Sequence, residues 1–286
     1  MEKNIRLRPA EPADFQALSM LVNNEFYVHR HLDWRSPLDW LTNRPFWILE
    51  SAINLQMKAA LSLAVDPPGV AWVRLFAAGG LTDLLEVWQE LLPPCLEELR
   101  SQQPKCIIAA VVVHTWFERL LQHSGFRHTQ DIVVLSWNDR PLPVFRLPPD
   151  LMVREIQEED LEEVHRLDNM AFSPLWSLSY DGLRRAFQQS AYSTLLIENN
   201  EIVGYQITTA SDFSAHLARL AVHPRLQRRG IGRAIVADML THFADRGVIH
   251  ITVNTQSDNT SSLTLYQHLG FERTQETLPV FVYPEI

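Results

Sequence analysis

The sequence predicts a mixed α/β fold that is built twice in one chain, and three observations support this prediction. Residues 139–150 contain four prolines, which stop helices and remove strand donors, so this segment is expected to be an extended linker. The parts on either side, residues 1–138 and 151–286, share an internal repeat. Both parts also alternate segments of strand-like and helix-like periodicity, which is typical of α/β domains.

The repeat is clearest near the end of each half. Residues 120–130 (LLQHSGFRHTQ) align with residues 265–275 (LYQHLGFERTQ) with seven identities at an offset of 145. The earlier matches, at offsets of 145 or 146, are Arg8 with Arg154, Asp14 with Asp160 and Arg74 with Arg219. Matches in separate windows at almost one offset indicate a duplication.

Turn and cap residues set the limits of the elements in the second half. Acidic residues occupy the first turn of the first predicted helix, where the helix dipole favours them. Asn199 and Asn200 are a good turn pair for a hairpin, and Gly247 and Gly270 each follow a helix in the usual C′ position. The predicted strands are residues 151–156, 194–198, 202–209, 216–222 and 249–253, with 271–274 and 280–283 finishing the sheet. The predicted helices are residues 158–172, 180–189, 230–245 and 260–269.

Composition argues against several classes of protein. The 286 residues carry a formal net charge of -9, which argues against nucleic acid as the main partner. Only two cysteines are present, so a reducing compartment, the cytoplasm, is favoured. Residues 57–80 are apolar but interrupted by charges, so no membrane span is expected. The N-terminus lacks the apolar region of a signal peptide, and the histidines lack the spacing of a zinc site.

The sharpest chemical signal lies where an apolar strand is followed by a loop of arginines and glycines, at residues 220–234 (LAVHPRLQRRGIGRA). The start of a helix presents unpaired N–H groups and a partial positive charge. Glycine lets the backbone approach a ligand closely, and four arginines add positive charge. These are Arg225, Arg228, Arg229 and Arg233. The pattern predicts an anion-binding site at the start of the following helix.

A second element lies downstream, at residues 259–271 (NTSSLTLYQHLGF). Asn259 is expected to contact a ligand, to cap the helix, or to do both, because asparagine is a strong N-cap. The Q-x-x-G-x-G loop at residues 227–232, Asn259 and Tyr266 together resemble the GNAT superfamily of acyl-CoA-dependent N-acetyltransferases over residues 151–283. The resemblance implies tandem α+β domains, each with a mixed, mostly antiparallel central sheet flanked by helices.

The resemblance also implies the transfer of an acetyl group from acetyl-CoA to a primary amine by direct attack. The pyrophosphate would rest on the N–H groups of the loop, and the pantetheine arm would pair with the strand at Leu220 and Val222. A backbone N–H of the same strand would polarise the thioester carbonyl. The cofactor-binding residues implied in this way are Leu220, Ala221, Val222, Gln227, Arg228, Arg229, Gly230, Ile231, Gly232, Arg233, Asn259 and Tyr266.

Two residues are the candidates for catalysis. Tyr266 is the expected general acid, because a phenol suits the basicity of the departing thiolate. His216 is the candidate general base, because an imidazole accepts a proton near neutral pH and because it falls where some relatives carry a catalytic glutamate. Strand alternation is expected to place His216 on the same face as Leu220 and Val222. Asp212 and a chain of water molecules are the alternatives.

The first half keeps the repeat but lacks these features. Its predicted strand, residues 70–76, is followed by Gly79 and Gly80 without the arginine-rich loop, and Leu121 stands at the position of the tyrosine. We therefore expect a degenerate GNAT-like half without catalysis, in a layout similar to that of double-domain acetyltransferases.

The acceptor is left open between a small amine and a peptide or protein N-terminus, and other acyl donors are also open. Residues 171–177 (AFSPLWS) resemble the acceptor loop of ribosomal-protein N-terminal acetyltransferases, with an inserted Leu175, and plain core packing is the alternative. A non-catalytic acyl-CoA-binding sensor or scaffold is a second interpretation. A structural pair, in which the tryptophan-rich first half forms a homodimer, is the third.

Overall fold

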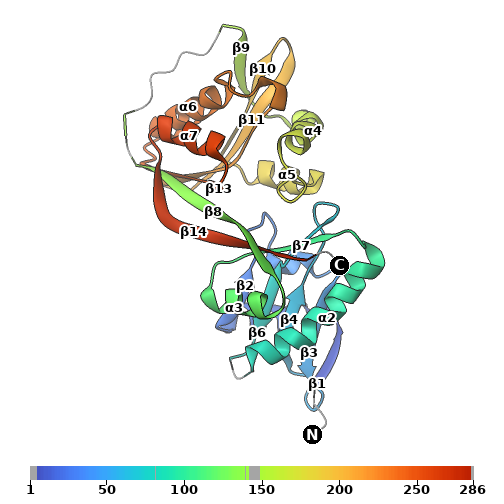
Figure 1. Ribbon diagram of the computed structural model, residues 1–286. Coiled ribbons are helices and arrows are strands. Elements are labelled where there is room, and N and C mark those ends of the chain that lie inside the picture. The colour runs from blue at the N-terminus through green and yellow to red at the C-terminus, as the bar shows by residue number, and fades with distance from the viewer. Residues whose placement is uncertain (1–4, 81, 139, 142–148, 285–286) are drawn as a thin grey trace. The chain divides into compact units, whose positions relative to one another are not determined.

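The structure, a computed structural model, describes residues 5–80, 82–138, 140–141 and 149–284. The chain forms two compact units (Figure 1). Unit 1 contains the residues up to Thr129 together with those from Pro279 onward, and unit 2 is Gln130–Leu278. The predicted mixed α/β architecture is confirmed in both units. Most of the predicted linker, including Pro143 and Pro148, lies outside the described residues.

Unit 1 contains a five-stranded antiparallel sheet with the strand order β1-β3-β4-β6-β2. The long helix α2 packs Trp88 and Leu91 against Phe76 and other buried residues of this sheet. A short strand, β5, pairs in parallel with β7 outside the five-stranded sheet. The strands are β1 (Ile5–Pro9), β2 (Tyr27–Arg30), β3 (Phe46–Ser51), β4 (Met57–Ser62), β5 (Val70–Trp72), β6 (Leu75–Ala78) and β7 (Ile107–Val111). The helices are α1 (Phe15–Asn24), α2 (Leu84–Gln102) and α3 (Thr115–His123).

Unit 2 is built on a sheet with the strand order β14-β8-β13-β12-β11-β10-β9. From β8 to β9 only the pair of β12 and β13 is parallel. Figure 1 shows α6 and α7 on one face of this sheet and α4 and α5 on the other. The strands are β8 (Arg127–Asn138), β9 (Leu151–Glu155), β10 (Tyr192–Glu198), β11 (Glu201–Ala210), β12 (Ser214–Val222), β13 (His250–Gln256) and β14 (Glu272–Tyr283). The helices are α4 (Leu161–Ala171), α5 (Tyr180–Gln188), α6 (Ile231–Ala244) and α7 (Thr260–His268). None of the described helices is long and apolar enough to cross a membrane.

The two units share the contacts that the internal repeat predicts. The Arg8 guanidinium donates to both oxygens of Asp14 at 2.7 and 2.8 Å, and Arg154 donates to both oxygens of Asp160 at 2.6 and 2.7 Å. Each carboxylate also accepts the backbone N–H of the third residue before it at 2.8 Å. The same ion pair therefore joins the first strand of each unit to the turn before its first helix.

The last strand corrects one expectation about the sheet of the second half. Residues 280–283 were expected to finish that sheet, but Val280–Tyr283 pair with β7 of unit 1. In return, residues 132–138 of β8 pair with β13 of unit 2. The compact units therefore differ from the predicted domains 1–138 and 151–286, because each unit takes a strand segment from the other half of the sequence.

A second correction concerns the predicted strand at residues 70–76. The structure divides it into β5 and β6. The N–H of Val73 donates to the carbonyl of Ala109 on β7, the partner of β5, whereas the N–H of Arg74 donates to the carbonyl of Ser62 on β4, each at 2.9 Å. The strand is divided because its pairing partner changes between these two residues.

Candidate active site

Strand β12 carries the residues that were predicted to bind the cofactor, and it contains a β-bulge. Consecutive residues of β11 pair with Leu217 and Arg219, so Ala218 has no partner on that strand. An extra residue of this kind shifts the alternation of side chains beyond it. Leu217 and Leu220 consequently both pack toward α6.

The bulge shows that one prediction about His216 was wrong. The neighbours Ala215 and Leu217 pack with α6 and α7, so His216 between them points to the opposite face of the sheet. It therefore does not share a face with Leu220 and Val222, which pack toward α6. Strict alternation fails here because the bulge lies between the two parts of the strand.

Beyond the bulge, one edge of β12 is open. Its parallel partner β13 pairs only with Ser214–Leu217. The N–H of His223 donates to the carbonyl of Val203 at 2.9 Å. Because alternate residues of an antiparallel ladder exchange hydrogen bonds, this register turns the amides of Leu220 and Val222 away from β11. Within residues 149–284, no strand pairs with the edge on which these amides lie.

The loop after β12 places backbone N–H groups at the start of α6. Arg228 and Gly230 have positive φ angles of 63° and 86°, a conformation that glycine adopts at little cost. Gly230 is the N-cap of α6 and supplies no side chain to cap it. The first N–H bonded within the helix is that of Ala234, which donates to Gly230 at 2.9 Å. The N–H groups of Ile231 and Gly232, which precede it in the first turn, are therefore available to an anion.

Side chains of the loop hold it in place and give it positive charge. The Gln227 amide donates to the outward carbonyl of Val222 at 3.2 Å. Arg229 forms an ion pair of 3.0 Å with Glu198 at the end of β10, while its side chain remains 53% exposed. Arg228 and Arg233 are also exposed. The loop thus combines free helix N–H groups with several accessible cations, which suits a pyrophosphate.

Two glycines allow α6 to lie close to its neighbours. A Cβ on Gly232 would come within 3.2 Å of Leu265 on α7. A Cβ on Gly204 of β11 would come within 2.8 Å of Ile235 and 3.1 Å of the Ala221 carbonyl. Gly204 was not singled out from the sequence, because a glycine within a strand shows its use only once the helix above it is known.

Helix α7 carries the other two predicted residues. The Asn259 side chain accepts the N–H of Ser262 at 3.1 Å, which confirms the expected N-cap. Tyr266 is buried, with 4% of its surface exposed. It packs in the hydrophobic core that α6 and α7 form with the sheet. Within the described part of the chain, the Tyr266 hydroxyl has no hydrogen-bond partner. Burial raises the pKa of Tyr266, which keeps the phenol protonated at neutral pH.

His216 lies where β12 and β13 part. Its Nδ1 lies 2.8 Å from the hydroxyl of Thr252 on β13. Burial lowers the pKa of His216 below its ordinary value of 6.5, so the imidazole is mainly neutral at pH 7. Asp212, the alternative base, is exposed in the turn before β12.

A buried ionic group that the sequence analysis missed joins β12 to the loop between α4 and α5. The Arg219 guanidinium donates to both oxygens of the fully buried Asp168 at 2.7 Å. The hydroxyl of buried Tyr205 also donates to this carboxylate. Asp168 falls on the apolar stripe of its helix with Leu161 and Val164, and this was the signal that could have revealed it.

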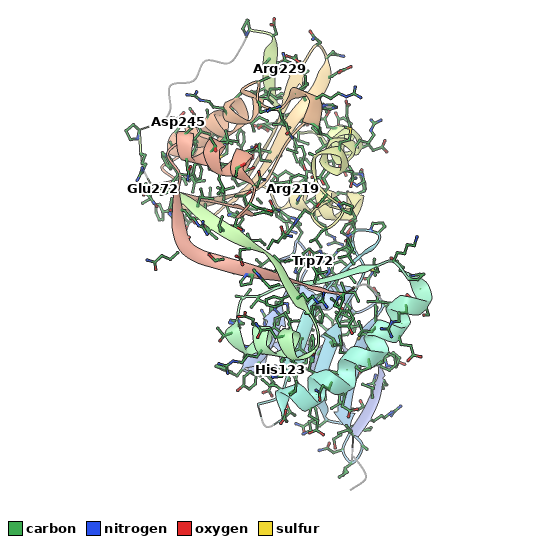
Figure 2. The ribbon with its side chains drawn as sticks, viewed as in Figure 1. Trp72, His123, Arg219, Arg229, Asp245 and Glu272 are labelled. Atoms are coloured by element: carbon green, nitrogen blue, oxygen red, sulfur yellow. The ribbon has the colours of Figure 1, made fainter. Side chains whose placement is uncertain are left out.

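Arg219 also holds the loop that was predicted to receive the acceptor. It donates to the carbonyl of Trp176 at 2.8 Å, and its guanidinium lies 3.6 Å from the centroid of the Phe172 ring. The N–H of Leu178 donates to Asp168 at 3.0 Å. Figure 2 labels Arg219 and Arg229, which lie at separate places in unit 2. Among the described residues, no group of three or more His, Cys, Asp or Glu is placed to hold a metal ion.

Comparisons with known proteins agree with this geometry. Residues 161–271 match the model of the acetyltransferase (GNAT) family. The [ribosomal protein bS18]-alanine N-acetyltransferase of Escherichia coli K12 is 24% identical over 119 residues, which are 42% of this chain and 79% of that protein. A mycothiol acetyltransferase of Kytococcus sedentarius is 28% identical over 144 residues, which cover 46% of this chain and 49% of that protein. A solved tandem GNAT protein from the clavulanic acid biosynthesis pathway matches with a TM-score of 0.64 at 15% sequence identity. The match covers 97% of this chain and 98% of that protein's chain.

The family match supports an acyltransferase of the class that uses an acyl-CoA donor. Residues 161–271 are a GNAT-family acetyltransferase domain, and the chain as a whole has the fold of tandem GNAT proteins.

Proposed function

We propose that unit 2 transfers an acetyl group from acetyl-CoA to a primary amine by direct attack. The open edge of β12 supports this proposal most strongly, because it leads directly into the uncapped start of α6. An extended arm can add to a free strand edge, and a pyrophosphate can accept from helix N–H groups. The open edge and the helix start follow one another in space, as the pantetheine arm and the pyrophosphate follow one another in coenzyme A.

The residues along this path fit the donor. The amides of Leu220 and Val222 would pair with the pantetheine arm, and the N–H groups of residues 228–233 would hold the pyrophosphate. Asn259 would add a contact while it caps α7. The bound donor supplies an activated acyl thioester. A backbone N–H of β12 near Ala221 would polarise its carbonyl oxygen.

Tyr266 would act as the general acid. Its burial keeps the hydroxyl protonated, and a hydroxyl without a partner among the described residues is free to donate to the leaving sulfur. His216 would accept the proton of the attacking amine through its free ring nitrogen, because Nδ1 is engaged with Thr252. Asp212 and bound water remain the alternatives to His216.

The acceptor would lie against the loop at residues 172–178. Phe172 and Trp176 are half-buried there, and Tyr180 is 41% exposed at the start of α5. An aromatic-lined loop suits either a small apolar amine or the N-terminus of a peptide. The relative that acts on the alanine of ribosomal protein bS18 favours testing peptides first.

The replacement Tyr266→Phe tests the proposal. Calorimetric titration with acetyl-CoA should give a dissociation constant within about threefold of the wild type, because the ring is kept. Turnover on a panel of amines and N-terminal peptides should fall by about 100-fold, as expected for the loss of a general acid. Unchanged turnover would remove Tyr266 from the mechanism. Tight binding of acetyl-CoA without turnover on any amine would instead favour a sensor or scaffold.

A further inference from the structure

Strands β6 of unit 1 and β12 of unit 2 hold equivalent places in the two repeats. Each precedes the helix that begins the second part of its unit, α2 or α6. Phe76 and Ala78 of β6 pack toward α2, as Leu220 and Val222 of β12 pack toward α6. The amides of these two pairs can therefore be compared directly.

In unit 1, strand β2 covers the edge that is open in unit 2. It pairs antiparallel with β6 along its whole length, from Tyr27 opposite Ala78 to Arg30 opposite Leu75. The N–H of His31 donates to the carbonyl of Arg74 at 3.0 Å. This register directs the amides of Phe76 and Ala78 to β2. The protein's own strand thus makes the pairing that an added arm would make on β12.

The N–H groups after β6 are also occupied by the chain. The carboxylate of Asp83, the N-cap of α2, accepts from the N–H groups of Leu85 and Glu86 at 3.0 and 3.1 Å. The carboxylate of Glu25 accepts from the N–H of Gly80 at 2.8 Å. In unit 2 the N-cap of α6 is Gly230, which has no side chain to fill this place. Unit 1 therefore places negative charge where unit 2 presents free N–H groups and arginines.

We infer that unit 1 holds an internal substitute for acyl-CoA, formed by β2 along the strand edge and by the carboxylates of Glu25 and Asp83 at the N–H groups, so that the chain takes up one acyl-CoA, in unit 2. The inference rests on the proposed function for the position of the donor on β12. Pairing within the chain costs no translational entropy, so β2 competes strongly with a free ligand. The carboxylates would also repel its phosphates.

The number of sites is measured by calorimetric titration of the full chain with coenzyme A, which carries the arm and the phosphates without a reactive acyl group. We expect one equivalent per chain. A second equivalent, or a site that persists after the unit 2 loop is blocked, would overturn the inference.

The replacement Gly230→Asp blocks the loop by giving unit 2 the N-cap residue that unit 1 has at Asp83. We expect it to raise the dissociation constant of coenzyme A by at least about 30-fold, because like charges would meet. Gly230→Asn is the matched control, since asparagine has nearly the same shape, tolerates a positive φ and carries no charge. It should raise the dissociation constant less than Gly230→Asp does, because it can cap the same N–H groups but does not repel the phosphates. Equal losses in the two variants would contradict the electrostatic part of the inference.

Amide hydrogen exchange, resolved by residue, separates this inference from the proposed function. Without ligand, the amides of Phe76 and Ala78 should exchange slowly and those of Leu220 and Val222 rapidly. Of these four amides, saturating coenzyme A should slow exchange only at Leu220 and Val222. Slowing at Phe76 and Ala78 would show that β2 gives way and would overturn the inference. A failure to bind at all would overturn the proposed function, whereas slow exchange at Phe76 and Ala78 would still support occupation of that edge by β2.

Discussion

His216, the proposed general base, lies in surroundings that keep its imidazole neutral. Burial lowers its pKa, and the Thr252 hydroxyl holds Nδ1 at 2.8 Å. A neutral imidazole with one fixed nitrogen leaves the other available to accept a proton. The same burial weakens the imidazole as a base, because the protonated, charged form is the one that loses solvation.

The pH dependence of the reaction follows from this direction of shift. A base with a lowered pKa stays unprotonated at pH 7, so kcat/KM should begin to fall only below about pH 6.5. His216→Gln should lower kcat/KM by about 100-fold at pH 7 and remove this acidic limb. His250→Gln is the control, because His250 also bonds a polar side chain, Asn138, but is exposed. An acidic limb that persists in His216→Gln would assign the base to Asp212 or water.

The loop between α4 and α5 is an element whose shape depends on one buried ion pair. Arg219 lies on β12 next to the proposed cofactor residues, and it bonds both Asp168 and the carbonyl of Trp176. Breaking a buried pair is costly because it leaves an uncompensated charge. Arg219 thus positions the loop and does not itself need to touch the acceptor.

The conservative replacement Arg219→Lys tests this role. Lysine keeps the charge beside Asp168 but loses the planar group that bonds three oxygens at once. We expect KM for the amine to rise by about tenfold, while the dissociation constant of acetyl-CoA changes by less than about threefold. Arg184→Lys is the control, because Arg184 forms an exposed pair with Glu158. An unchanged KM for the amine, in a variant whose thermal unfolding shows it to be folded, would contradict the positioning role.

At the scale of the whole molecule, each unit depends on a strand segment from the other half of the chain. Phe281 of β14 is 2% exposed in the core of unit 1, beside Phe126 and Tyr283. Phe271, ten residues earlier, is 2% exposed in the core of unit 2. The end of the chain therefore stabilises the unit with which the chain begins.

Two matched replacements separate the units. Phe281→Ala should destabilise unit 1 by about 3–5 kcal/mol, the usual cost of removing a buried phenylalanine, and Phe271→Ala should do the same to unit 2. Hydrogen exchange should then speed up mainly in α2 for the first variant and mainly in α6 for the second. Faster exchange in α6 alone after Phe281→Ala would show that the exchanged strand does not support unit 1.

The sequence by itself determined the repeat, the order of strands and helices in the second half, and the anion loop. These features depend on local patterns: side-chain periodicity, cap residues and glycines within a few positions of one another. Residues 227–232, Asn259 and Tyr266 could be singled out because their spacing along the chain carries the signal.

Only the tertiary structure decided which faces and edges these elements present. The bulge at Ala218, the division of the strand at Arg74 and the exchange of the end of β14 all depend on which strands pair. Pairing is set by hydrogen bonds and packing between residues far apart in the sequence, and one extra residue moves a side chain to the other face. For the same reason the cover of β2 over β6 could not be predicted from the repeat.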